Sequence, residues 1–126
     1  MKDSYKLIIA GGRDFFDADK LNSEMDRIWK EQCFPADHTY EIVSGGAKGA
    51  DALGEAWAKS KGLDIKVFEA DWKTHPRAAG PIRNKQMAEY ADGLVAFWDK
   101  KSKGTKNMID TALKMGLVVV VIEVKV

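Results

Sequence analysis

Short apolar runs alternate with amphipathic segments along this chain, and this alternation constrains the fold most strongly. The apolar runs are of strand length and lie at 5–10, 40–44, 64–70, 94–98 and 117–124. The segments between them carry apolar residues at helical spacing. Because right-handed crossovers between parallel strands place helices on both faces of one sheet, the alternation predicts a Rossmann-like three-layer α/β sandwich. Its five-stranded, mainly parallel sheet is expected in the order 3-2-1-4-5.

Capping and helix-breaking residues indicate where the helices begin and end. Asp17 or Asp19 can cap the first helix, which is expected to run to about residue 32. Gly62 and Gly116 are suited to end the second and fourth helices, and Pro81 fits the first turn of the third. The third apolar run alternates with polar residues, which predicts a strand that is exposed on one side and lies near a sheet edge.

Length and charge limit the classes of protein that fit this sequence. With 126 residues, of which 45% are hydrophobic, residues 1–126 are expected to form one domain with an ordinary core. The formal net charge is only +1. Nucleic-acid-binding domains are typically strongly basic, so this charge argues against nucleic acid as the partner.

The sequence also carries signals of cellular location. No apolar stretch is long enough to cross a membrane, and no signal-peptide pattern precedes the first strand. The single cysteine, Cys33, is expected to be a buried or half-buried reduced thiol at a helix end. These features predict a cytoplasmic protein. His38 and His75 lack the spacing and the cysteine partners of a zinc site, so no metal site is predicted.

Glycine-rich and polar segments follow the predicted strands. In the expected order the chain reverses direction between strands 1 and 4, which opens a crevice at the carboxyl ends of the strands. Turns of this kind expose backbone N–H groups and the positive end of a helix dipole, which suits phosphate. The candidate ligand-binding residues are Gly11, Gly12, Arg13 and Asp14 after strand 1, Ser44, Gly45, Gly46, Lys48, Gly49 and Asp51 after strand 2, Arg83 and Asn84 at the third helix, and Ser102, Gly104 and Thr105 after strand 4.

These residues supply different parts of an anion or nucleotide pocket. Arg13 and Arg83 can each hold phosphate through a two-pronged guanidinium, whereas the carboxylate of Asp51 suits ribose hydroxyls or a base edge. Structural explanations stay open at each position. The glycines can simply turn the chain, Arg13 and Asp14 can pair at the surface, Lys48 can be solvated, and Asp51 can complement the helix dipole.

An irregular polar segment precedes the third helix. Trp72 or His75 in this segment can stack on a base as a rim or lid over the crevice. The alternative is a loop aromatic that packs on the sheet edge. No cofactor is required by these patterns, although Mg²⁺ can accompany a phosphorylated ligand.

Several short motifs, in their order along the chain, resemble one family. They are Gly11–Phe15 (GGRDF), Ser44–Asp51 (SGGAKGAD), Gly80–Met87 (GPIRNKQM), Phe97–Asp99 (FWD) and Ser102–Thr105 (SKGT). Together they are similar to the YspA-type branch of the SLOG superfamily, which includes the LOG phosphoribohydrolases and DNA-processing protein A and whose YspA-type members occur in bacteria and phages. The resemblance implies a Rossmann-like sheet with a pocket for nucleotides or nucleotide-derived ligands.

The sequence departs from the catalytic relatives at one motif. LOG enzymes carry Pro-Gly-Gly-x-Gly-Thr-x-x-Glu, and Met108 stands here where that glutamate is expected. A carboxylate at this point acts on the N-glycosidic bond, so its replacement weakens a catalytic interpretation. Asp14, Asp51 and Asp110 are the carboxylates that could take over, although the resemblance assigns none of them.

Two functions therefore compete. The first is binding of a nucleotide or a nucleotide-derived phosphorylated small molecule in the crevice at the carboxyl ends of strands 1, 2 and 4, in a sensor, carrier or sequestering role. The second is an N-glycosidic-bond hydrolase or transferase of the LOG type with a rearranged site. A DNA-binding module is disfavoured by the charge, and a homo-oligomer is expected from the helical surfaces.

Overall fold

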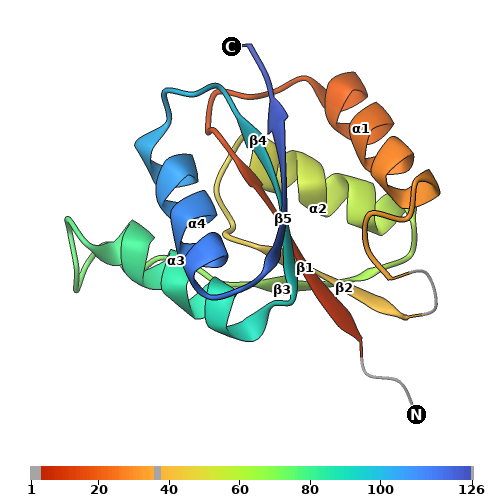
Figure 1. The fold of residues 1–126 in the computed structure, drawn as a ribbon. Helices are drawn as coiled ribbons and strands as arrows, with labels where there is room; N and C mark the ends of the chain where they lie inside the picture. Colours follow the sequence, from red (N-terminus) through yellow and green to blue (C-terminus); the bar gives the residue numbers. More distant parts are fainter. Residues whose placement is uncertain (1–3, 36–37, 126) are drawn as a thin grey trace.

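The computed structural model describes residues 4–35 and 38–125, and its elements follow the expected alternation (Figure 1). In chain order they are β1 (Tyr5–Gly11), α1 (Ala18–Lys30), β2 (Tyr40–Ser44), α2 (Ala50–Ser60), β3 (Asp64–Val67), α3 (Ala79–Tyr90), β4 (Gly93–Trp98), α4 (Lys103–Lys114) and β5 (Val118–Glu123). All neighbouring strands pair in parallel, in the order β3-β2-β1-β4-β5. The predicted fold class and strand order are confirmed.

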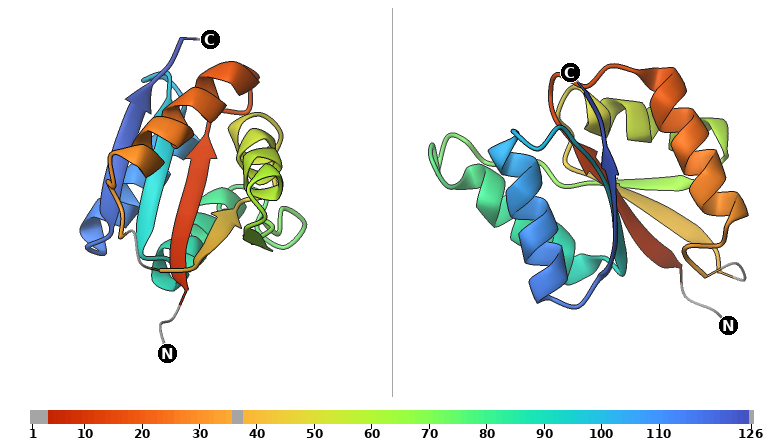
Figure 2. Two further views of the ribbon diagram at one scale, coloured as in Figure 1. Left: turned by 90° about the vertical axis from the view of Figure 1, so that its right-hand side faces the viewer. Right: turned by 45° about the horizontal axis from the view of Figure 1, so that its top comes forward.

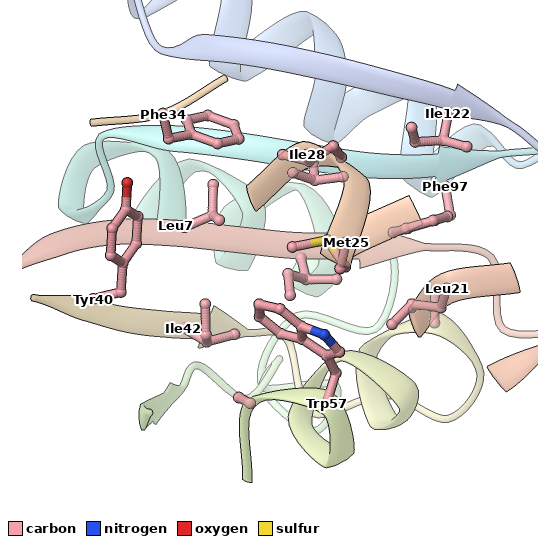
Figure 3. Close-up of a cluster of buried hydrophobic side chains, with 14 of the residues drawn as sticks. Leu7, Leu21, Met25, Ile28, Phe34, Tyr40, Ile42, Trp57, Phe97 and Ile122 are labelled. Atoms are coloured by element: carbon pink, nitrogen blue, oxygen red, sulfur yellow. The ribbon is translucent and has the colours of Figure 1, made fainter. Parts of the chain in front are cut away.

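The helices form two layers around the sheet. Helices α1 and α2 cover one face, and α3 and α4 cover the other (Figure 2). Leu21 and Met25 of α1 and Trp57 of α2 are buried against β1 and β2 in the larger core cluster (Figure 3). Met87 of α3 and Met108 of α4 are buried in the second cluster, on the opposite face. Because both faces are covered, β4 between its neighbours is buried almost throughout.

Most of the predicted element ends agree with the structure. Asp17 caps α1, since its Oδ1 accepts a hydrogen bond of 3.0 Å from the backbone N–H of Lys20. The strand predicted over 64–70 is shorter and ends at Val67, and α3 begins at Ala79, two residues before Pro81. β3 lies at the edge of the sheet and is mostly exposed, as its alternating pattern predicted.

The expectation for Cys33 was wrong. Helix α1 ends at Lys30 with Glu31 as its C-cap, so Cys33 lies beyond the helix, and its side chain is exposed. The neighbouring Phe34 takes the buried position instead, packing against the ring of Tyr5.

No helix within the described part of the chain is both long and apolar enough to cross a membrane.

Candidate functional site

A cavity of about 730 Å³ opens at the carboxyl ends of β1 and β4. The connections leaving these two strands run to opposite faces of the sheet, so no helix fills the space between them. Its volume lies within the range of small-molecule sites. The predicted residues that line it are Gly11, Gly12, Arg13, Asp14, Asp51, Arg83, Asn84, Ser102, Gly104 and Thr105.

A second cavity of about 380 Å³ adjoins the first. Gly45, Gly46 and Lys48 of the β2–α2 loop line it, together with Glu69 and Ala70, which follow β3. The two cavities have four residues in common: Arg13, Ala47, Trp72 and Arg83. The structure thus divides the predicted site residues between two adjacent cavities.

Two predicted site residues line neither cavity. Ser44 is buried, and its Oγ donates to Glu55 Oε2 at 2.6 Å and accepts from the Gly46 N–H at 3.1 Å. Gly49 has φ +79°, and a Cβ there would lie 2.4 Å from the carbonyl oxygen of Gly12. Ser44 shapes the β2–α2 loop, and Gly49 lets that loop contact the loop after β1.

A buried carboxyl and a guanidinium lie side by side on the wall of the main cavity. Asp51 is 6% exposed, and its Oδ2 accepts from the Ala47 N–H at 3.2 Å. Arg83 Nη1 donates to the Gly45 carbonyl oxygen at 2.6 Å. A Cβ at Gly45 would lie 2.6 Å from Arg83 Nη1 and 2.8 Å from Asp51 Oδ2, so only glycine leaves room for both side chains.

Burial shifts the pKa of both groups. Removal from water raises the pKa of Asp51 to about 6, against the lowering effects of the Ala47 N–H and of Arg83. Burial also lowers the pKa of Arg83 from its ordinary value, while the Asp51 carboxylate raises it. Asp51 therefore titrates near neutral pH, and Arg83 remains a cation.

Asn84 joins α3 to the start of α4. Its Nδ2 donates to the Gly104 carbonyl oxygen at 3.2 Å and to Asn107 Oδ1 at 2.9 Å. Its Oδ1 accepts from Arg83 Nε at 3.1 Å. Since these protein contacts occupy the donors and the acceptor of a buried amide, Asn84 positions Arg83 and α4 at the cavity wall.

The N-terminus of α4 forms the wall opposite α2. Ser102 caps the helix, with its Oγ 3.3 Å from the Thr105 N–H and 2.9 Å from Thr105 Oγ1. Asp99 Oδ1 accepts from the backbone N–H groups of Lys101 and Ser102, both at 2.8 Å, and these bonds lower the pKa of Asp99. The turn is fixed before any ligand arrives, and the first amides of α4 have no helical acceptor.

Two cations of this cavity are not among the predicted site residues. Lys101 and Lys103 both line it, and no side-chain partner exists for either within the described residues. Within the segment 99–103, the sequence indicated only Ser102 as a site residue. The signal that could have identified them is their position on either side of Ser102, directly after a buried strand and before a helix.

Other residues considered in the sequence also have definite places. Trp72 lines both cavities, and its ring centre lies 5.7 Å from the Arg13 guanidinium carbon, whereas His75 lines neither. Met108 lines the main cavity. Asp110 is exposed and pairs with Lys106 at 2.7 Å, away from the cavity. Among the described residues, no group of three or more His, Cys, Asp or Glu side chains could hold a metal ion.

Comparisons with known proteins identify similar chains. A family model described as "YspA, cpYpsA-related SLOG family" matches residues 5–75. "Gene 61 protein" of Mycobacterium phage D29 is 32% identical, over 75% of this chain and 88% of that protein. DNA processing protein A (DprA) from Streptococcus pneumoniae has a similar structure, with a TM-score of 0.71, 17% identity and 98% of this chain covered. The chain spans about half of DprA, 51% of its length, and this likeness shows the fold alone.

Proposed function

Because the chain belongs to the YspA, cpYpsA-related SLOG family, we propose that it binds a nucleotide or a nucleotide-derived phosphorylated small molecule in the cavity between β1 and β4. The binding serves a sensor, carrier or sequestering role. Nucleotides and their phosphorylated derivatives occur in the cytoplasm, which is the location we propose for the protein. Mg²⁺ accompanies the ligand where the protein does not fully neutralise its phosphates.

The observation that carries the proposal is a set of cations in one cavity that have no hydrogen-bond or ion-pair partner among the described residues. The side chains of Arg13, Lys101 and Lys103 line the main cavity and make no hydrogen bond or ion pair with any described residue. Lys101 and Lys103 flank Ser102, the N-cap of α4, whose dipole also favours an anion. Within the same cavity Asp51 supplies an acceptor for hydroxyl groups.

Isothermal titration with AMP, ADP, ADP-ribose and inorganic phosphate tests the proposal. We expect saturable binding of at least one nucleotide, weakened about tenfold or more by Lys103→Glu because the charge at the anion site is reversed. Lys85→Glu is the matched control, since Lys85 is an exposed residue of α3 that lines neither cavity. Its affinity should stay within about twofold of wild type, because salt screens distant surface charges.

A second variant tests the same cavity without changing charge. A Cβ at Gly12 would meet no atom closer than 4.0 Å, and φ there is not positive, so Gly12→Leu places a side chain in the cavity without strain. Folded Gly12→Leu, checked by circular dichroism, should not bind the nucleotide. The proposal would be overturned if wild type did not bind any nucleotide, or if Lys103→Glu and Gly12→Leu both bound as tightly as wild type.

The buried carboxyl favours a second candidate function, hydrolysis or transfer at an N-glycosidic bond. Asp51 lines the cavity with a pKa of about 6, which suits a general acid or base at neutral pH. Release of adenine from AMP, followed by chromatography, should then depend on Asp51 and be abolished by Asp51→Asn. Binding without any release of base at high protein concentration would leave only the binding function.

Self-association belongs to the proposal as well. Val118 and Val121 of the edge strand β5 are 51% and 45% exposed, and Leu113 and Met115 at the end of α4 are 57% and 41% exposed. Exposed apolar edges of this kind favour pairing with another chain. Sedimentation equilibrium of wild type and of Val121→Lys measures whether a homo-oligomer forms through this edge.

A further inference from the structure

The sheet has two edge strands, and the sequence protects one of them but not the other. β3 spans four residues, and its Asp64 and Lys66 are exposed. β5 spans six residues, and its sequence carries no charge before Glu123. Native edge strands are commonly short and charged, which prevents them from pairing with another chain. β3 has this protection, whereas β5 forms a longer apolar edge without it (Figure 2, left).

The backbone of β5 has hydrogen-bonding groups that point away from the sheet. The N–H of Val118 donates to the Asp92 carbonyl oxygen at 3.3 Å. The N–H of Val124 donates to the Trp98 carbonyl oxygen at 3.0 Å, so the even-numbered residues of β5 face β4. Because successive residues of a strand alternate in direction, the N–H and C=O groups of residues 119, 121 and 123 point outward. Among the described residues, β4 is the only strand that pairs with β5.

Apolar side chains are exposed along the same edge. Val118 and Val121 of β5 are exposed, and so are Leu113 and Met115, at the end of α4 and in the turn that leads to β5. A strand laid along β5 would remove part of this surface from water, which is favourable. The edge therefore offers a partner strand both hydrogen bonds and apolar contact.

A second copy of β5 meets these requirements when the two strands run antiparallel about a twofold axis. In an antiparallel pair, residues directly opposite each other exchange hydrogen bonds through their facing N–H and C=O groups. If Val121 lies opposite Val121 of the second copy, residue 119 lies opposite 123, and all three outward-facing residues pair. In the neighbouring registers, residue 119 or residue 123 would face a residue outside β5. The interface is also closed, because both copies use the same strand.

The charges near the end of β5 are compatible with this register. Glu123, which pairs with Lys100 at 3.2 Å, lies opposite Val119 of the second copy and not opposite another carboxylate. Lys125 lies opposite Leu117 of the second copy. Like charges that face each other directly would destabilise the pair, and this register opposes none.

From these observations we infer that β5 pairs antiparallel with β5 of a second copy, with Val121 on the twofold axis. The two copies then form one continuous sheet of ten strands, five from each copy. Because the strands of the two copies run in opposite directions, the main cavities open at opposite ends of this sheet, and each is built from one chain. The inference rests on the self-association in the proposed function and gives it a geometry.

Disulfide trapping tests the register. Cys33→Ser removes the single native cysteine and provides the background. In this background Val121→Cys places two thiols opposite each other, with Cα atoms about 5.5 Å apart, inside the roughly 4.4–6.8 Å range of disulfides. Oxidation should therefore link the chains into covalent dimers.

Val118→Cys, in the same background, is the matched control because Val118 is also an exposed valine of β5. In the inferred register, position 118 lies opposite residue 124 of the second copy and roughly 20 Å along the strand from position 118 there. Its chains should crosslink at least about tenfold more slowly than those of Val121→Cys.

Sedimentation equilibrium tests the surface independently. Val121→Lys should be monomeric, because two ammonium groups would face each other at the axis. Val67→Lys, which changes an exposed valine on the opposite edge strand β3, should remain dimeric like wild type. AMP should bind Val121→Lys as tightly as wild type, since each cavity is built from one chain.

The inference is overturned if wild type is monomeric, if Val121→Lys remains dimeric, or if Val118→Cys crosslinks as fast as Val121→Cys. A dimeric wild type whose Val121→Cys does not crosslink would associate in another way, so self-association would stand and this geometry would not. If wild type were dimeric but bound no nucleotide, the proposed binding function would fail and the inference about β5 would not.

Discussion

At the scale of single residues, the close contacts around the glycine-rich loop determine what the site can do. Asp51 and Arg83 approach each other only because Gly45 has no side chain between them. Asp51 is 6% exposed, so its charge is costly in the folded protein and its pKa rises to about 6. The loop therefore places an ionisable carboxyl, with a pKa near neutral, next to a fixed cation.

The raised pKa of Asp51 makes stability depend on pH. Its pKa is about 6 in the folded protein against an ordinary value of 3.8, so ionisation costs more in the folded state. The contribution of Asp51 to the free energy of unfolding is fully present below about pH 4. It is lost as the pH rises through about 6, by up to about 3 kcal/mol. In urea unfolding, the free energy of unfolding of Asp51→Asn, relative to that of wild type, should rise by this amount between pH 4 and pH 7.

The control for this prediction is Asp110→Asn, because Asp110 is exposed and lies outside the cavity. Its stability relative to wild type should show no comparable gain between pH 4 and pH 7, since an exposed ion pair contributes little. A difference between Asp51→Asn and wild type that stayed constant over this range would contradict the buried, raised carboxyl.

A comparison of Gly49 with Gly62 distinguishes the cost of a positive φ from the cost of a steric clash. Both have positive φ, +79° and +70°, but a Cβ at Gly49 would lie 2.4 Å from the Gly12 carbonyl oxygen, whereas a Cβ at Gly62 would meet nothing within 4 Å. Gly62→Ala should cost about 1 kcal/mol of unfolding free energy, and Gly49→Ala more than about 3 kcal/mol. Denaturant unfolding measures both, and equal costs would show that Gly49 tolerates a side chain.

At the scale of elements, the N-termini of α1 and α4 are both capped by a side chain but have different roles. Asp17 caps α1 through the Lys20 N–H at 3.0 Å, and Ser102 caps α4 through the Thr105 N–H at 3.3 Å. Of these two, the α4 terminus lines the main cavity and the α1 terminus does not, and Asn84 ties α4 to α3 there. Its cap thus contributes both to stability and to the shape of the proposed anion site.

Removing the two caps should distinguish these roles. Asp17→Ala and Ser102→Ala should each cost about 1 kcal/mol of unfolding free energy, because each leaves a helical N–H without its acceptor. Ser102→Ala should also weaken AMP binding about fivefold, whereas Asp17→Ala should not. Thermal unfolding and isothermal titration on the same samples measure both effects, and equal affinities for the two variants would argue against an anion at α4.

At the scale of the whole molecule, the charge is nearly balanced. Twenty basic and 19 acidic residues give a net charge of +1, and the cations of the site face a cavity that also contains Asp14, Asp51 and Asp99. A long polyanion would meet these carboxylates at close range. A small ligand that enters the cavity can instead place each anionic group beside a cation.

We therefore expect no binding of single-stranded DNA, despite the structural likeness to DprA. Fluorescence anisotropy of a labelled oligonucleotide should show no saturation up to about 10 μM protein at low salt, where phosphate contacts are strongest. Saturable binding whose affinity falls steeply as salt is added would contradict this prediction and would indicate a nucleic-acid surface that the net charge does not reveal.

The sequence alone determined the parallel sheet, its order, the helix positions and the sheet edge at which the candidate site lies. These follow from local patterns: the apolar runs, the cap at Asp17, and the rule that parallel strands bring their carboxyl ends to one edge. The motif that contains Gly49 and Asp51 was recognisable for the same reason, since glycine and polar residues after a strand are read directly from the sequence.

Only the tertiary structure decided how the predicted site residues are divided between two cavities. It separates the site into two cavities, turns Ser44 inward to Glu55, and brings Lys101 and Lys103 to the cavity wall. It also leaves Cys33 exposed. Sequence spacing fixes which residues share an element, but the direction in which a loop side chain points depends on the distant segments packed around it. The contact between Arg13 and Trp72 arises in this way, because it joins two loops that are far apart in the chain.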